Sequence, residues 1–168
     1  MSMTDLMNAP PYDPTRDNRR RNFFIGIAIT VFLLGILTLA GYVLGHGWLF
    51  TNLGYEHRVD KFFDALQDKD YAKAYGLYYN DPDWQQHPAT YSGYPLARFT
   101  EDWTAFSPVH EPITSHHVDI SKTDGSGYFG SGVIVAVRVN GNNKVFMYVT
   151  RADKTMTWPA PHELGYNP

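Results

Sequence analysis

The chain of 168 residues has room for one domain of ordinary size and an accessory segment. It contains no cysteine, which excludes disulfides, thiolate metal sites and a cysteine nucleophile. The net charge is −3, and no basic stripe occurs after Tyr55, which argues against nucleic-acid partners and against binding to anionic lipid through the domain.

An apolar stretch without any Lys, Arg, Asp or Glu runs from Phe23 to Phe50. About 20 helical residues at about 1.5 Å each span a hydrocarbon core of about 30 Å. We therefore predict a transmembrane helix over residues 23–48, in contact with the lipid bilayer. The basic flank before it contains Arg19, Arg20 and Arg21. Because such flanks stay in the cytoplasm, we expect a cytoplasmic (inner) membrane location with the N-terminus inside and a periplasmic or otherwise extracytoplasmic C-terminal domain.

Residues 1–22 are polar, basic and without periodicity, so we predict a disordered cytoplasmic tail. A cleaved export signal is the alternative, because Arg20-Arg21-Asn22-Phe23-Phe24 resembles part of a twin-arginine signal and cleavage after Ala40 would leave Gly41 first. The apolar stretch exceeds the roughly 7–15 residues of the apolar core of a signal peptide, which favours an uncleaved anchor. Within it, Gly41 and Gly45 form a small-xxx-small pair that permits close contact with a second membrane helix.

A short linker, residues 49–55, is expected to lead into an exported domain over residues 56–160. Apolar residues at helical spacing between Val59 and Leu66 predict its first helix. Asp70 can cap a second helix, which Asn80-Asp81-Pro82 ends. A loop rich in aromatic residues follows, and a third helix is predicted from Leu96 to Phe106.

Beyond Pro112 the period of the apolar residues changes from 3.6 to 2, which predicts strands. The expected strands cover residues 114–121, 129–139, 144–151 and 155–158, joined by turns at 124–127, 140–143 and 153–154. Alternation places the apolar side chains of each strand on one face, toward the helices, and leaves the other face partly exposed. The apolar series are His116, Val118 and Ile120 in the first strand, and Val133, Val135, Val137 and Val139 in the second. An irregular tail over residues 161–168 completes an α+β fold, with helices packed on an antiparallel meander.

Two segments resemble nuclear transport factor 2-like domains. In VDKFFDALQDKDYAKAYGLY, residues 59–78, a helix with a Phe-Phe pair leads into an Asp-Tyr helix, and PLARFTEDWTAFSPVHEPITSHHVDIS, residues 95–121, resembles their third helix and first long strand. The resemblance implies that the antiparallel meander is a curved sheet whose mouth is filled by the helices, which forms a cone with an internal pocket. This superfamily includes isomerases, dehydratases, ligand carriers and structural modules, so the fold alone names no function. Its implied pocket residues are Tyr75, Tyr78, Asp102 and His116.

The histidines give no strong sign of chemistry. His116 and His117 are neighbours on a predicted strand, so they face opposite sides and cannot share one metal. His117 and Asp119 share a face, where they form a polar pair on the solvent side. The pairs His110-Glu111 and His162-Glu163 lack the His-x-x-x-His spacing of a helical zinc site. We therefore assign no catalytic residue, and predict no metal, no cofactor and no enzymatic activity.

Aromatic residues make up 15% of the chain and gather in its helical half. They serve either as core or as a contact surface, for which Trp84, Tyr91 and Tyr94 are the candidates. We expect a non-catalytic accessory or scaffold subunit that contacts other membrane-protein subunits or a second copy of itself. The layout resembles that of assembly components of type IV secretion systems and of membrane proteins associated with lipid uptake. The alternatives are a small-ligand-binding or SnoaL-like enzyme that uses the cone pocket, and an assembly factor for a respiratory oxidase.

Overall fold

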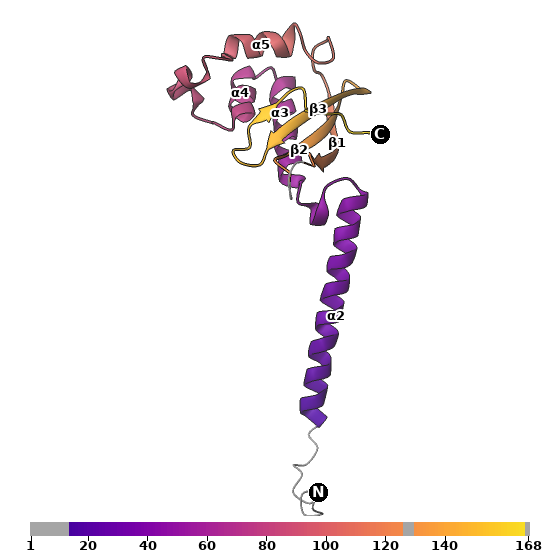
Figure 1. Cartoon of the computed structure of the whole chain (residues 1–168). Helices are drawn as coiled ribbons and strands as arrows, with labels where there is room; N and C mark the ends of the chain where they lie inside the picture. Colours follow the sequence, from indigo (N-terminus) through magenta and orange to yellow (C-terminus); the bar gives the residue numbers. More distant parts are fainter. Residues whose placement is uncertain (1–13, 126–129, 167–168) are drawn as a thin grey trace, which may run out of the picture. The chain divides into compact units, whose positions relative to one another are not determined.

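The computed structural model describes residues 14–125 and 130–166 (Figure 1). The chain divides into two compact units, residues 1–37 and 38–168. The first helix, α2 (Pro14–Val43), is long and apolar enough to cross a membrane, and its most apolar window is exposed throughout. It begins before the predicted residue 23 and includes the basic flank, so the predicted tail is partly helical. Residues 1–13, the rest of that tail, lie outside the described residues.

A compact turn follows α2. The helix ends at Val43, before the predicted residue 48, because Gly45 and Gly47 adopt positive φ angles of 79° and 80°. The short helix η1 (Trp48–Phe50) comes next, and α3 (Leu53–Gln67) begins within the residues predicted to be a linker. The predicted short linker over 49–55 is therefore occupied by η1, a tight turn and the start of α3. We call residues 38–56 the junction.

The remaining helices follow the predicted order. Asp70 caps α4 (Tyr71–Tyr79), as predicted, and its Oδ1 accepts a hydrogen bond of 3.0 Å from the backbone N–H of Lys73. Asn80 ends α4 in the left-handed conformation, with φ of 55°. The aromatic-rich loop contains η2 (Trp84–Gln86) and η3 (Pro88–Tyr91), and leads to α5 (Leu96–Thr104).

The four strands are β1 (His116–Thr123), β2 (Gly132–Val139), β3 (Asn143–Thr150) and β4 (Met156–Thr157). They form an antiparallel meander in the order β1-β2-β3-β4, which confirms the α+β class. Asn140 and Gly141 form the predicted turn between β2 and β3, with φ of 48° and 92°. Part of the predicted turn at 124–127 and the predicted strand residue Phe129 lie outside the described residues.

The alternation predicted for the first strand fails at Asp119. The pairing of β1 with β2 shifts register between Val118 and Ile120, because one extra residue is inserted there as a β-bulge. Val118 packs against the core on the helix side, whereas Ile120 joins the cluster on the opposite face. Ser121 in turn points toward α3, where it reaches Glu56. The prediction that His116, Val118 and Ile120 share one face is therefore wrong.

Both faces of the sheet carry packed side chains. The helix-side core contains the predicted valines Val133, Val135, Val137 and Val139, together with residues of α3, α4 and α5. The opposite face carries a second cluster, formed by Ile134, Ala136, Phe146 and Leu164. The C-terminal residues 160–166 are irregular, as predicted, yet they cover this second face, so it is not left open. The finer cone geometry implied by the family resemblance stays a prediction.

Candidate functional site

A pocket of about 260 Å³ lies where α4, the loop before α5, α5 itself and the end of the sheet meet. Its lining residues are Tyr78, Tyr94, Asp102, Trp103 and Trp158. α4 supplies Tyr78, the loop after η3 supplies Tyr94, α5 supplies Asp102 and Trp103, and Trp158 follows directly after β4. Four aromatic rings and one carboxylate thus converge from segments far apart in the sequence.

Helix α5 fixes the carboxylate of this pocket. Phe99 and Trp103 lie one turn apart on the buried face of α5, which holds the helix on the core and leaves Asp102 at the edge. The Tyr94 hydroxyl donates a hydrogen bond of 2.9 Å to Asp102 Oδ2, and Arg98 Nε lies 3.0 Å from Asp102 Oδ1. Both carboxylate oxygens are already engaged, an arrangement better suited to electrostatic binding than to proton abstraction.

The structure brings together two of the four predicted pocket residues, Tyr78 and Asp102. Tyr75 is buried behind the pocket, and its hydroxyl donates a hydrogen bond of 2.7 Å to the carbonyl of Tyr94. His116 does not line the pocket. Its ring stacks on Phe63 at 5.7 Å, and its Nε2 lies 3.2 Å from Asp60 Oδ1 on α3.

The predicted contact residues Trp84, Tyr91 and Tyr94 are only partly exposed and pack against the core. Trp84 Nε1–H donates to the carbonyl of Ala72 at 3.2 Å, and the Tyr91 hydroxyl donates to Asp81 Oδ2 at 2.6 Å. Their polar tips are therefore used within the chain. These rings form a covering layer over α4, and their role as a contact surface stays a prediction.

Burial and hydrogen bonding hold the phenols of this region in the neutral form. Burial is the main cause that raises the pKa of Tyr75 and of Tyr78 to about 12. The hydrogen bond to Asp81 is the main cause that raises the pKa of Tyr91 to about 12. Burial, with the nearby Asp102 carboxylate, raises the pKa of Tyr94 as well. Tyr78 and Tyr94, which line the pocket, are therefore uncharged at any pH near neutrality.

These raised values predict loss of stability in alkali. The pKa of Tyr75, Tyr78 and Tyr91 lies higher in the folded state than the ordinary value of 10, so folding holds their protons more tightly. Their stabilising contribution is complete below pH 10 and is lost as the pH rises from about 10 toward 12. We expect phenolate absorbance and far-ultraviolet circular dichroism to change together in that window. If all 12 tyrosines lost their protons near pH 10 while the circular dichroism stayed unchanged, the predicted loss of stability would be contradicted.

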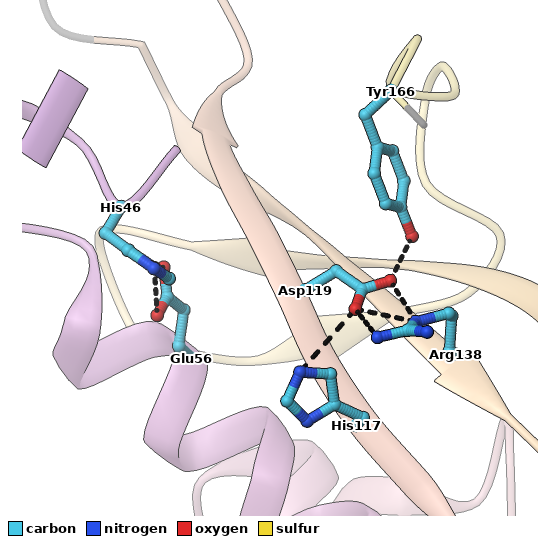
Figure 2. A network of polar contacts seen from close by, with 6 residues as sticks. All are labelled: His46, Glu56, His117, Asp119, Arg138 and Tyr166. Atoms are coloured by element: carbon cyan, nitrogen blue, oxygen red, sulfur yellow. Dashed lines mark hydrogen bonds and ion pairs between the residues drawn. The ribbon is translucent and has the colours of Figure 1, made fainter. Parts of the chain in front are cut away.

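A second polar network lies on the opposite face of the sheet (Figure 2). The bulged Asp119 is almost fully buried and accepts hydrogen bonds from Arg138 Nε at 2.7 Å and from the Tyr166 hydroxyl at 2.7 Å. His117 shares this face with Asp119, as predicted, with 3.7 Å between Nε2 and Oδ1, but only His117 is exposed, so the pair does not lie on the solvent side as a whole. Asp119 therefore connects β1, β2 and the C-terminal residues, so this network has a structural role.

A third network holds the junction. Glu56 is 6% exposed, His46 Nδ1 lies 2.9 Å from its carboxylate (Figure 2), and the Ser121 hydroxyl donates to Glu56 Oε1 at 2.5 Å. The backbone N–H of Ser121 also donates to the carbonyl of Gly45 at 2.7 Å. The residues that follow α2 are thus bonded to β1 by side chain and backbone together.

The predicted glycine pair is used within this junction. A Cβ atom on Gly41 would lie 2.5 Å from the carbonyl oxygen of Gly47 and 2.8 Å from the nitrogen of Phe50. A Cβ atom on Gly45 would lie 2.8 Å from Ile120 Cγ2. Both glycines therefore permit close packing inside the chain.

Sequence reasoning missed Trp103 and Trp158 as pocket residues, and missed Glu56 and Ser121 as the centre of the junction. A tryptophan set among prolines at the end of a weak strand was a signal for Trp158. Glu56 carried no signal, because its partner Ser121 lies 65 residues away and its partner His46 lies in the segment predicted to be the membrane helix. Among the residues that the structure describes, no group of three or more His, Asp or Glu side chains is placed to hold a metal ion.

Comparison with models of known protein families, with curated proteins and with solved structures found no match.

Proposed function

We propose that this chain is a single-pass membrane protein with an uncleaved anchor, α2, and that its domain is a non-catalytic accessory subunit of a membrane-protein assembly on the extracytoplasmic side. The observation that carries the proposal is the junction, in which the end of the apolar helix is folded into the domain. The backbone bond from Ser121 to Gly45 and the pairing of His46 with Glu56 hold this end in place. An arrangement of this kind suits a domain that must stay beside the bilayer.

The helix itself supports an anchor over a cleaved signal. Residues 38–41, around the possible cleavage point after Ala40, lie inside α2 without a break. Gly41 is buried beneath residues 47–50 and therefore belongs to the folded unit. The basic residues Arg19, Arg20 and Arg21 precede the apolar window, and their charge favours the orientation with the N-terminus inside.

The exposed apolar side chains support a surface beside the bilayer. Beyond Val43, the large ones that the structure describes are Leu44, Trp48, Leu49, Leu53, Phe106 and Trp158. Four of these six lie in the junction, directly after the membrane helix. Trp48 is 66% exposed and contacts Tyr42 edge to face, an arrangement typical of the aromatic belt at a membrane interface. This part of the domain is where we expect contact with a neighbouring subunit or with lipid.

The absence of native cysteine allows a direct test with single-cysteine variants of the full-length chain. We expect Glu101→Cys to react with a membrane-impermeant maleimide added from outside intact cells. A photoreactive maleimide at Trp48→Cys should yield one defined crosslinked protein species in the membrane, because this position faces the proposed neighbour. Glu101→Cys, half-exposed on α5, is the matched control and should give no such product.

N-terminal sequencing of the same membrane extract tests the anchor. We expect a start before α2, and a start at Gly41 would overturn the anchor. Labelling of Glu101→Cys only after permeabilisation would overturn the orientation. A chain that purifies alone, without a crosslinked product at Trp48→Cys, would overturn the role as an accessory subunit.

A further inference from the structure

We infer that the pocket formed by Tyr78, Tyr94, Asp102, Trp103 and Trp158 binds a quaternary ammonium group of the choline type. This binding activity goes beyond the proposed accessory role and does not depend on the anchor. The same chemistry is available from a free solute and from the headgroup of phosphatidylcholine, and the test below separates the two sources.

The walls of the pocket provide aromatic rings set at angles to one another. The Trp103 and Trp158 rings lie 6.0 Å apart at 60°, and the Tyr78 and Tyr94 rings lie 6.1 Å apart at 51°. Aromatic faces carry partial negative charge and attract a cation within about 6 Å of the ring centre. Several rings around one small cavity form the aromatic cage that recognises quaternary ammonium ligands.

The charge of the site also favours a cation. Arg98 lies 3.0 Å from Asp102 and 3.5 Å from Glu101, so one positive group is shared between two carboxylates on α5. The sum over these three side chains is +1 − 2 = −1. Asp102 is the one that lines the pocket, and its side chain is 25% exposed, so its field is only partly screened.

Hydrogen bonding distinguishes a quaternary ammonium from a primary one. Tyr94 and Arg98 already use one acceptor site on each Asp102 oxygen, and an ionised carboxylate has about four such sites. A primary ammonium brings three donors, more than the roughly two sites left on Asp102 can satisfy, so at least one donor would depend on a tyrosine hydroxyl or lose its water partner. A trimethylammonium group has no donor to satisfy, so it gains the attraction of the rings without that cost.

Trp158 makes the site accessible. Its side chain is 39% exposed, whereas Trp103 is 4% exposed and forms the floor. A ligand can therefore enter beside Trp158 without disturbance of the core. The pocket volume of about 260 Å³ suits a group the size of trimethylammonium and excludes a large ligand.

The test uses the full-length chain in maltoside micelles, which contain no ammonium group. Choline is titrated against its uncharged carbon isostere, 3,3-dimethylbutan-1-ol, and binding is followed by the indole N–H signals in heteronuclear magnetic resonance at constant ionic strength. We expect saturable choline binding with a Kd on the order of 1 mM, and at least about tenfold weaker binding of the isostere. Equal binding of both compounds, or no binding of choline, would overturn the inference.

Matched variants locate the site. Asp102→Asn and Glu101→Gln each remove one carboxylate near Arg98, but only the first lines the pocket. We expect Asp102→Asn and Trp158→Leu to weaken choline binding about fivefold or more, and Glu101→Gln to leave it within about twofold. Should Trp158→Leu fail to fold, Trp158→Phe keeps a smaller ring and should bind more weakly than the original chain. If Asp102→Asn and Glu101→Gln weakened choline binding equally, the assignment of choline to this pocket would be wrong.

Lipid nanodiscs separate the two sources. If the indole N–H signals of Trp103 and Trp158 shift from their positions in micelles when the chain is in phosphatidylcholine discs, but not when it is in phosphatidylglycerol discs, the lipid headgroup is the ligand. Shifts with free choline alone identify a solute. Both results uphold the site. Stronger binding of n-butylammonium than of choline would instead show a site for a lysine side chain, and would overturn the choice of a quaternary group.

Discussion

Phe62→Ala is expected to lower the free energy of unfolding by about 3–5 kcal/mol. Phe62 is fully buried, and its ring contacts those of Phe63, Tyr78, Phe99 and Trp103 at centroid distances of 5.0–6.2 Å. Removal of this ring leaves a cavity between α3, α4 and α5 that backbone elements cannot close. Because a domain of this size has only about 5–15 kcal/mol of stability, the loss is a large part of the whole.

Chemical denaturation of the full-length chain in detergent micelles, followed by near-ultraviolet circular dichroism, measures this loss. Phe106→Ala is the matched control, since Phe106 is 57% exposed, and it should change the stability by less than about 0.5 kcal/mol. The experiment also bears on the interior of the domain. A loss below about 1 kcal/mol for Phe62→Ala would mean that the helices do not fill the space over the sheet, and that the pocket extends into it.

Local patterns were enough to predict most elements of this fold. The helical spacing of apolar residues from Val59 to Leu66 is sufficient to predict α3, because a helix with one apolar stripe can bury it in only one way, against the sheet. Asp70 was recognised as a cap because a short acceptor before a helical run satisfies a free backbone N–H. The turn at Asn140-Gly141 was recognised because few residue pairs accept two positive φ angles.

Two features of the sheet depended on longer-range contacts. The bulge at Asp119 has no signature in composition, and one extra residue sends Ile120 to the other face. The covering of the second face depends on Leu164, with Ala160 and Tyr166 packed beside it in an otherwise polar tail. The sequence does indicate that the second face is covered. The strand Gly132–Val139 is apolar at nearly every position, as in strands that are buried on both faces.

The pocket was predictable only in part, for a related reason. Tyr78 and Asp102 lie on helices whose order the sequence indicates, so their convergence could be suggested. Trp158 reaches the pocket only because β4 pairs with β3 and ends beside α5, a position that depends on the whole meander. His116 does not line this pocket, and its partners Asp60 and Gln67 lie on the polar side of α3.

Gly41→Ala is expected to destabilise the junction, and this is the second large effect on stability that we predict. In most helices alanine is favoured over glycine by about 1 kcal/mol. Here the new Cβ atom would lie 2.5 Å from the Gly47 oxygen and 2.8 Å from the Phe50 nitrogen, and both are backbone atoms that cannot rotate away. We expect a net loss of about 1–3 kcal/mol. Hydrogen exchange should rise at the amides of residues 44–56 and at Ser121, whose N–H bonds to Gly45.

Gly35→Ala is the matched control, because it lies in the same helix with nothing within 4 Å of the added atom, and it should not destabilise the domain. The pair of variants also decides between two roles for the small residues of this helix. If Gly41→Ala left the stability and hydrogen exchange unchanged but abolished a crosslinked dimer in the membrane, Gly41 would serve contact between helices. If the exchange rises and any dimer persists, the glycine is there so that the chain can turn tightly from the membrane helix into the domain, as the close approach of residues 47–50 requires.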